Sequence, residues 1–238
     1  MAHGCDAYRL GVDDTPGNDP GTAPGTGPVV VGFDLDMTLV DSRPGIVDAL
    51  HALADEVGGD EASVLRDDTL LVTLLRSTLD RVLTECFGPA RGEVLADRYR
   101  TIYADVGVRG TTLLPGADTA VAHVRGRGGR VVVVTAKYEP NARRCLDHVG
   151  LAVDAVHGWL HGSEKAAALR AEGAHLYVGD TTSDMDAARH ADAIGLGVAS
   201  GTHDPEHLTA CGAVSVLGSL EEFVPWWHAA GVHLGLPG

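Results

Sequence analysis

The run over residues 29–42 constrains the fold more than any other part of the chain. It reads V-V-V-G-F-D-L-D-M-T-L-V-D-S, so a short apolar segment ends abruptly in Asp34 and Asp36. A continuous apolar run predicts a strand that is buried on both faces, as in the centre of a mostly parallel sheet. Side chains alternate along a strand, so both acids are expected on the same side at its carboxyl end, where ligands bind in open α/β sheets. Two carboxylates so close together repel each other unless one holds a proton or a cation lies between them.

A regular alternation of strands and helices is predicted for the second half of the chain. Such alternation implies right-handed crossovers and a parallel sheet that is covered on both faces. We therefore predict an α/β fold with a doubly wound, mostly parallel sheet, and we expect Trp226 and Trp227 to close its core. The apolar strands are expected at residues 130–134, 153–156, 175–178, 193–198 and 213–216, with helices at 117–125, 139–149, 164–171, 183–191, after Pro205 and at 220–230.

The segment between the first strand and this alternation has a helical pattern and no strand signal. Ser42 is a plausible N-cap, and Pro44 suits the first turn of a helix. Further along, one apolar face at helical spacing is formed by Leu70, Leu71, Leu74, Leu75, Leu79, Val82 and Leu83. We therefore predict an inserted α-helical cap domain. The predicted organisation is a disordered tail over residues 1–28, a core domain over 29–43 and 115–238, and the cap over 44–114.

Composition narrows the class of protein. The 238 residues carry a net charge of −15 and are 45% hydrophobic, which allows a full core. The acidic balance argues against nonspecific binding to nucleic acid or to an anionic membrane. The four cysteines are widely spaced and include no CxxC pair, as expected for reduced cytosolic thiols. With neither a signal-peptide core nor a membrane-spanning run, a cytoplasmic protein is predicted, either a monomer or a homodimer.

Polar residues terminate three of the predicted strands. Asp34, Thr135 and Asp180 follow apolar runs whose carboxyl ends meet at one edge of a parallel sheet. Asp184 lies one helical turn beyond Asp180, and Lys165 is the only cation that we expect at this acidic edge. Hard oxygen ligands of this kind suit Mg²⁺, which completes its coordination with water and substrate phosphate. A metal there would screen the acids, so that a carboxylate could approach an anionic phosphorus.

With these motifs in order, residues 29–227 resemble the haloacid dehalogenase superfamily of aspartyl phosphatases, particularly its phosphoglycolate phosphatase-like branch with a helical cap. The resemblance rests on D-L-D-M-T-L-V-D-S, the threonine after V-V-V-V, the lysine of G-S-E-K and the motif G-D-T-T-S-D. It implies that Asp34 is the nucleophile and Asp36 the general acid and base. It also implies that Thr135 holds the transferring phosphoryl group and that Lys165 steadies its charge. The implied Mg²⁺ ligands are Asp34, the backbone carbonyl of Asp36, Asp180, and Asp184 directly or through water.

Some positions depart from the family pattern. Met37 stands where glycine is usual, and Ala136 stands where the T-N-K form of the second motif has asparagine, although Lys137 fits. The cap sequence L-L-R-S-T-L lacks a glycine that often faces the site in the family. The candidate substrate contacts are Thr38, Ala136, Lys137, Arg43 and Arg76. The two arginines could bind a substrate carboxylate or second phosphate, but a solvated helix charge explains each at least as well.

The predicted function is Mg²⁺-dependent hydrolysis of a small-molecule phosphate monoester through an aspartyl-phosphate. A sugar phosphomutase on the same scaffold, a nucleotidase and a pyrophosphatase remain as alternatives. The intact carboxylate set argues against a non-enzymatic binding protein, and dehalogenation does not need a metal–phosphate site. His157 and His161 suggest a metal pair, but Gly158 and Trp159 interrupt any helix there, so a core or surface position is expected for both.

Overall fold

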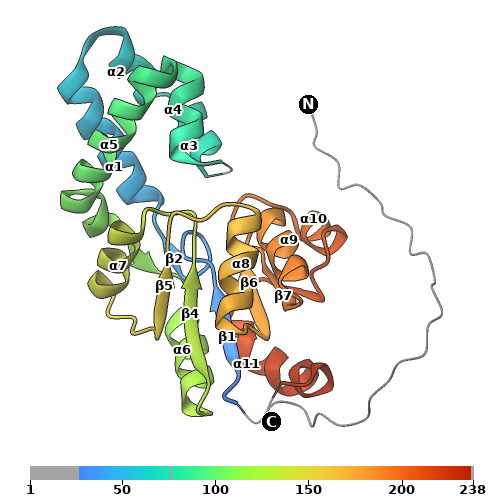
Figure 1. Ribbon diagram of the computed structural model, residues 1–238. Helices are drawn as coiled ribbons and strands as arrows, with labels where there is room; N and C mark the ends of the chain where they lie inside the picture. The colour runs from blue at the N-terminus through green and yellow to red at the C-terminus, as the bar shows by residue number, and fades with distance from the viewer. Residues whose placement is uncertain (1–26, 76, 237–238) are drawn as a thin grey trace.

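The computed structural model describes residues 27–75 and 77–236, and within them the predicted doubly wound sheet is present. All six strands of the sheet are parallel, and β1 lies at its centre, as the apolar run before Asp34 predicted (Figure 1). Most of the tail predicted over residues 1–28 and the candidate residue Arg76 lie outside the described residues. The strand order is β5 (Ala155–His157), β4 (Arg130–Val134), β1 (Val30–Phe33), β6 (Leu176–Gly179), β7 (Ile194–Val198) and β8 (Ser215–Leu217).

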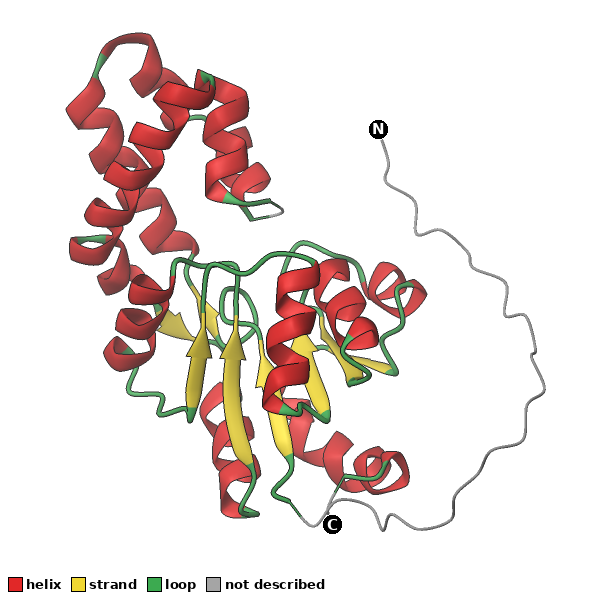
Figure 2. Cartoon of the chain, viewed as in Figure 1, coloured by secondary structure: helices red, strands yellow, loops and turns green. Residues whose placement is uncertain are grey.

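Helices cover both faces of this sheet (Figure 2). The side chains of Val31 and Phe33 pack on one face, whereas Val30 between them packs on the other, as alternation along a strand requires. The predicted strands and helices after residue 115 begin and end within two residues of the observed ones, except at the carboxyl end of the chain. The first face packs against α6 (Ala117–Gly126), α7 (Glu139–His148) and α11 (Phe223–Trp226), and the second against α8 (Ser163–Glu172) and α9 (Thr182–His190), while α10 (Pro205–Ala210) precedes β8.

The predicted final helix over residues 220–230 is not continuous. In its place the structure has three short helical segments of different types, and a fourth follows them. Pro225 lies in the middle of this segment and has no backbone N–H to donate, which disfavours a regular α-helix. The four turns are η2 (Leu220–Glu222), α11, the π-helical η3 (Trp227–Gly231) and η4 (Val232–Leu234).

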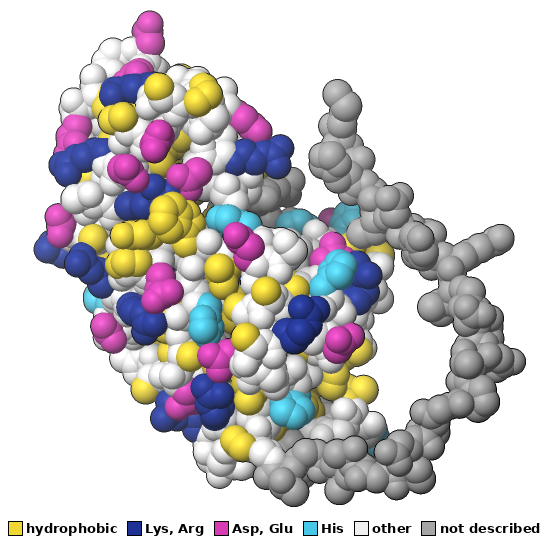
Figure 3. Space-filling model, in the orientation of Figure 1, with side chains coloured by type: hydrophobic (Ala, Val, Ile, Leu, Met, Phe, Trp, Pro, Cys, Tyr) yellow, Lys and Arg dark blue, Asp and Glu magenta, His cyan; other side chains and the backbone are white. Residues whose placement is uncertain are grey.

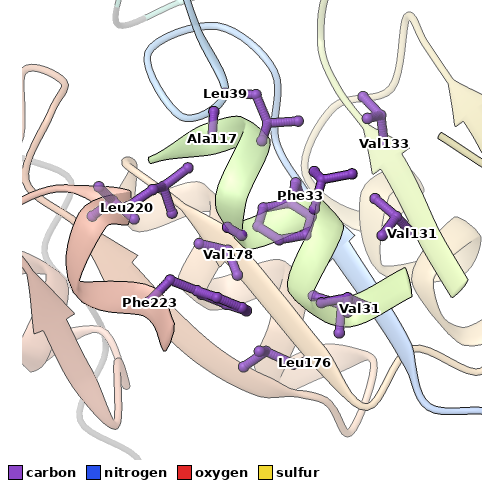
Figure 4. Close-up of a cluster of buried hydrophobic side chains, with 14 of the residues drawn as sticks. Val31, Phe33, Leu39, Ala117, Val131, Val133, Leu176, Val178, Leu220 and Phe223 are labelled. Atoms are coloured by element: carbon purple, nitrogen blue, oxygen red, sulfur yellow. The ribbon is translucent and has the colours of Figure 1, made fainter. Parts of the chain in front are cut away.

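The largest cluster of buried side chains lies on the face of the sheet that carries α6 and α11 (Figure 4). Phe33 at the end of β1 is fully buried, and its ring lies 5.8 Å from that of Phe223. Trp227 is also fully buried, and Trp226 is nearly so, which confirms that this pair closes the core. The strand that leads to Asp34 and Asp36 is thus anchored by its apolar residues.

The helical insertion between β1 and β4 has an apolar core of its own, around Leu53, Leu83 and Leu95. Gly58 and Gly88 take up left-handed φ angles at two of the helix junctions, and the side chains of Asp67 and Thr78 cap the amino termini of two helices. In Figure 2 the helices stand above the carboxyl ends of the strands. The elements are α1 (Arg43–Val57), α2 (Gly59–Leu65), α3 (Asp68–Leu74), α4 (Leu79–Phe87), α5 (Pro89–Asp105) and η1 (Gly107–Gly110). None of the helices in the described part of the chain is long and apolar enough to cross a membrane.

A two-stranded antiparallel ribbon, which the sequence did not predict, lies where this insertion leaves and re-enters the core. In it β2 (Val40–Asp41) pairs with β3 (Thr112–Leu113). Strands of two residues are too short to show an alternating pattern, which explains why they were missed. The ribbon brings both ends of the insertion together beside β1.

A close backbone contact joins α1 to η1 at the base of the insertion. A Cβ atom on Gly45 would lie only 1.9 Å from the carbonyl oxygen of Gly107. Glycine is therefore required by space at this point in α1, although alanine would favour the helix.

We expect Gly45→Ala to lower the free energy of unfolding by about 1–3 kcal/mol, because the added methyl group forces the two backbones apart. Gly126→Ala is the matched control, since Gly126 is also helical and a Cβ there meets nothing within 4 Å. That control should be neutral or slightly stabilising. Urea unfolding followed by circular dichroism measures both, and equal stability of the two variants would contradict the packing described here.

Candidate active site

A cavity of about 310 Å³ lies between the carboxyl ends of the central strands and the helical insertion. The chain runs from β1 outward through β4 and β5, and then returns to build β6, β7 and β8 on the other side of β1. Such a reversal creates a crevice at the carboxyl ends of the strands, which is the general ligand site of open α/β sheets. The predicted residues that line it are Asp34, Asp36, Thr135, Ala136, Lys137, Lys165 and Asp180.

A buried lysine links two of the carboxylates at this cavity. Lys165, in the first turn of α8, donates from Nζ to Asp34 Oδ1 at 2.9 Å and to Asp184 Oδ1 at 2.8 Å. The hydroxyl of Tyr177 on β6 lies 3.3 Å from the same Nζ, and it donates to the carbonyl oxygen of Val134 at 2.6 Å. The side chains of Asp34, Lys165 and Asp184 are almost completely buried. The structure thus brings together three residues that the sequence predicted at one edge.

Burial and charge act in opposite directions on this cluster. Burial raises the pKa of Asp34 to about 6, even though the charge of Lys165 lowers it. Burial alone would lower the pKa of Lys165, but the charges of Asp184 and Asp34 outweigh it and hold that pKa well above its usual value. Near neutral pH the lysine therefore carries its charge and Asp34 is mostly ionised.

Asp184 is held by protein groups on both of its carboxylate oxygens. Oδ2 accepts from the backbone N–H of Thr181 at 3.1 Å and from the Thr181 hydroxyl at 2.6 Å, which forms a capping box at the start of α9. Oδ1 accepts from Lys165, and the hydroxyl oxygen of Tyr177 lies 3.1 Å from it. A side chain at Gly179 would collide with this carboxylate, because its Cβ would lie 2.4 Å from the Cβ of Asp184. The G-D-T-T-S-D motif therefore supplies both a cap and a fixed charge.

Asp180 is the second acid of this motif and also has a fixed position. The hydroxyl of Thr38, which is fully buried, donates to Asp180 Oδ1 at 3.0 Å. A Cβ on Gly201 would lie 1.8 Å from the other oxygen, so the backbone there approaches the carboxylate closely. Burial, together with the charges of Asp184 and Asp34, raises the pKa of Asp180 well above its usual value. Thr38, predicted as a substrate contact, is not among the residues that line the cavity and instead orients Asp180.

The donor set fits a hard divalent cation. Asp34, Asp180 and Asp184 each offer a carboxylate oxygen, and these oxygens lie within 4.8 Å of one another in a buried position. Oxygen ligands with excess negative charge are the environment that Mg²⁺ selects. Burial is the main cause of the raised pKa of Asp180, and the neighbouring negative charges add to it, which a bound cation would relieve.

A second lysine reaches the acidic edge, so the expectation that Lys165 is the only cation there is wrong. Lys137 donates from Nζ to both oxygens of Asp36, at 3.0 and 3.2 Å. The same Nζ lies 4.1 Å from the ring centroid of Tyr103, which belongs to α5 in the insertion. Burial lowers the pKa of Lys137, but the charge of Asp36 and the neighbouring groups outweigh it and raise the pKa well above its usual value. Each of the two aspartates of the first motif thus has its own lysine.

Thr135 and Ala136 occupy the loop that follows β4. Thr135 is buried, and its hydroxyl oxygen accepts from the backbone N–H of Lys137 at 3.3 Å. Ala136 is exposed at the cavity. Alanine is smaller than the asparagine of the family's T-N-K pattern, so it fills less of the cavity at this position.

Met37 explains why glycine is usual at its position in the family pattern. Its φ angle is 63°, in the left-handed region that glycine adopts without strain. Its carbonyl oxygen accepts from the hydroxyl of Ser200, and its side chain is buried. A left-handed conformation costs a non-glycine residue about 1–2 kcal/mol, so the surrounding structure must hold this loop in place.

Arg43, another predicted substrate contact, is not brought to the cavity. It forms an ion pair with Asp41 at 2.7 Å and is half exposed. His157 bonds to Glu172 at 2.7 Å, whereas His161 lines the cavity, so the two histidines do not form a metal pair.

Two residues of the site could not be predicted from the sequence, namely Tyr177 beside Lys165 and Arg100 in the cavity wall. Tyr177 reads only as part of an apolar strand, and Arg100 reads as one of several charged helix residues. Arg100 is buried and pairs with Asp80 and Asp97, and its guanidinium lies 4.8 Å from the ring centroid of Trp159. No local pattern signals the contacts of Arg100 with Asp80 and Trp159, because these residues are far apart in the chain.

Comparisons with known proteins agree on one family. The family model described as haloacid dehalogenase-like hydrolase matches residues 31–189. A phosphoglycolate phosphatase of Cereibacter sphaeroides is 31% identical over 74% of this chain and 86% of that protein. A Mycobacterium tuberculosis protein named tyrosine-protein kinase PtkA is 33% identical, over 52% of this chain and only 41% of its own length. The structure of a haloacid dehalogenase-like hydrolase from Streptococcus pneumoniae superposes with a TM-score of 0.70 over 84% of this chain and 98% of that one, at 19% identity.

With the sheet, the acidic cavity and these matches together, the chain belongs to the haloacid dehalogenase-like hydrolase family. Within that family it is a phosphatase with a helical cap inserted after the first strand of the core. The helices α1 to α5 are called the cap from here on.

We expect Mg²⁺ to raise the melting temperature of the metal-free protein by roughly 5 °C or more at pH 7.5, because an ion that binds only the folded state stabilises it. At pH 5 the rise should be smaller. Asp34, with a pKa raised to about 6, and Asp180, with a raised pKa, then hold protons that the ion must displace. By the same sign, the contribution of Asp34 to the stability of the metal-free fold falls as the pH rises from about 4 through 6.

Differential scanning fluorimetry with EDTA or Mg²⁺ measures this shift. Asp180→Asn should lose most of it. Asp186→Asn on α9 should keep it, because Asp186 is partly exposed and pairs only with Arg189 among the described residues. An equal rise in both variants would contradict the assignment of Asp180 to the metal site.

Proposed function

We propose that this phosphatase hydrolyses small-molecule phosphate monoesters through an aspartyl-phosphate on Asp34, with Mg²⁺ as cofactor. The observation that carries the proposal is the position of Lys165, whose Nζ lies between Asp34 and Asp184 at the cavity that the cap covers. A carboxylate fixed by a buried lysine beside further acids is suited to attack an anionic phosphorus rather than to stabilise the fold.

The proposed metal ligands are Asp34, Asp180 and the backbone carbonyl of Asp36. Asp184 would act through water, since both of its oxygens already accept hydrogen bonds from the protein. Bound Mg²⁺ supplies positive charge that reduces the repulsion between the carboxylate and the phosphoryl oxygens.

In the first step a carboxylate oxygen of Asp34 attacks phosphorus, and the bond from phosphorus to the ester oxygen breaks. Asp36 gives its proton to that oxygen as it leaves, acting as general acid. The ammonium of Lys165 and the hydroxyl of Thr135 stabilise charge on the phosphoryl oxygens. Positioning and electrostatic stabilisation of this kind supply most of the catalysis in phosphoryl transfer.

In the second step the ionised carboxylate of Asp36 removes a proton from water. The resulting hydroxide oxygen attacks phosphorus, the bond to Asp34 breaks, and inorganic phosphate and the Asp34 carboxylate are restored. Lys137 keeps Asp36 in place through its two hydrogen bonds. The cap excludes bulk water from the first step, so that the leaving group is protonated before water enters.

Asp34→Asn should lower kcat/KM for p-nitrophenyl phosphate by about 10³-fold or more, because the amide cannot form the covalent intermediate. Phosphate release with Mg²⁺ and with EDTA measures this effect, and EDTA should abolish the wild-type activity. A melting temperature within a few degrees of the wild type shows that the variant is folded. A folded Asp34→Asn variant with wild-type activity would disprove the proposed nucleophile.

Asp36→Asn should slow turnover by about 10²–10⁴-fold. With p-nitrophenyl phosphate the second step should be slowed more than the first, because the p-nitrophenolate leaving group needs no proton to depart. We therefore expect a rapid burst of p-nitrophenolate, close to one per active site, followed by slow release. Stopped-flow absorbance measures the burst, and intact-protein mass spectrometry after acid quenching detects the phosphorylated chain. Slow turnover with neither a burst nor a phosphorylated chain would contradict the proposed role of Asp36 in the second step.

A further inference from the structure

We propose that the preferred ester has an uncharged leaving group with an apolar, preferably aromatic, face that is larger than the two-carbon acid glycolate. This inference rests on the proposed phosphatase function and concerns the part of the cavity that faces the leaving group.

The cap supplies an aliphatic wall to the cavity. Leu74 and Leu75 at the end of α3, with Leu79 at the start of α4, line the cavity and are only partly buried in the packing of the cap itself. Leucines at helix ends that open into a cavity gain contacts when an apolar group occupies it. With a small hydrophilic leaving group in the cavity, these leucine side chains would remain in contact with water.

Aromatic rings line the cavity on its other sides. Tyr99 and Tyr103 come from α5 in the cap, and Tyr138 and Trp159 come from the core. The rings of Tyr138 and Trp159 meet edge to face, with centroids 5.5 Å apart. An apolar or aromatic group in the cavity would therefore meet apolar surface from both the cap and the core.

Trp159 is held in an unusual conformation. Its φ angle is 61°, which is rare for a bulky residue, and its backbone N–H donates to the carbonyl oxygen of Lys137 at 2.8 Å. Half of its side chain remains exposed, although it lines the cavity. Strain of this kind persists where the surrounding structure enforces it and is frequent at ligand sites. The conformation places a large partly exposed ring where a leaving group would contact it.

The charges of the cavity disfavour a second anionic group. Among the described residues that line it, the lysine and arginine side chains all have carboxylate partners. Lys165 pairs with Asp34 and Asp184, and Lys137 pairs with Asp36. A carboxylate on the leaving group would have to displace an aspartate or lose its hydration without a partner, and either change is unfavourable.

Two further residues of the cavity, Arg100 and His161, offer little charge to such a group. Arg100 is held by Asp80 and Asp97, at 2.5 and 2.7 Å, and it lies against Trp159. Burial lowers the pKa of His161, which disfavours its charged form. The cavity volume of about 310 Å³ lies at the lower end of the range for small organic ligands, which accommodates a phosphoryl group with a ring attached.

Three alkyl esters with comparable leaving-group chemistry test this inference, namely benzyl phosphate, ethyl phosphate and phosphoglycolate. The wild type should show a kcat/KM at least about tenfold higher for benzyl than for ethyl phosphate, and lower for phosphoglycolate than for ethyl phosphate. Trp159→Ala should lower the benzyl-to-ethyl ratio about tenfold, and Trp159→Phe should restore most of it. Val214→Ala, at an exposed apolar residue outside the cavity, should leave the ratio unchanged.

Each unfavourable outcome has a distinct meaning. Asp34-dependent, Mg²⁺-dependent hydrolysis that is fastest with phosphoglycolate, or equally fast with benzyl and ethyl phosphate, would overturn this inference and leave the proposed function intact. A ratio unaffected by Trp159→Ala in a folded variant would also overturn it. Absence of hydrolysis of every ester would overturn the proposed function and this inference together.

Discussion

The buried lysine between Asp34 and Asp184 is the constraint on which the rest of the site depends. Lys165 must reach from α8 to Asp34 after β1 and to Asp184 in the first turn of α9, so the two helices and the strand must pack at fixed distances. Separating the partners of a buried charge pair would leave an uncompensated charge, which is energetically costly. The lysine and the two carboxylates are therefore held in one arrangement. Tyr177 strengthens it, because its hydroxyl joins the cluster to the backbone of β4. Catalytic geometry and core packing are therefore set by the same contacts. The face shown in Figure 3, in contrast, carries basic and acidic side chains interspersed.

Much of the core could be predicted because its signals are local. The apolar run before Asp34 identifies a central strand, and each βα repeat predicts a crossover in the parallel sheet. The residues that end β1, β4 and β6 could then be placed at one edge by topology alone. That reasoning brought Asp34, Thr135 and Asp180 together correctly, with Lys165 and Asp184 beside them. The helical insertion was predicted for the same reason, from apolar spacing without a strand signal.

Two of the side-chain contacts that the sequence did not reveal join residues far apart in the chain. Lys137 was expected near the substrate, but its pairing with Asp36 follows from the direction of a loop, which no residue pattern specifies. Thr38 was expected at the substrate, but its hydroxyl points to Asp180 instead. The strands β2 and β3 have two residues each, which is too short for a sequence pattern to predict them. Apolar spacing alone predicted one continuous final helix, but this segment contains Pro225 and is irregular in the structure. Residue propensities predict the secondary structure of local segments, whereas these details are determined by tertiary packing.

The position of Lys137 has a consequence for how such enzymes diversify. Its ammonium touches Asp36 in the core and the ring of Tyr103 in the cap, so one side chain belongs to both parts. An inserted segment that contacts only substrate could be exchanged between relatives as an independent module. Here the insertion also contributes, through Lys137, to the surroundings of Asp36, the proposed acid–base group. A cap taken from a relative would therefore need an aromatic ring at this point to keep the same surroundings for Lys137.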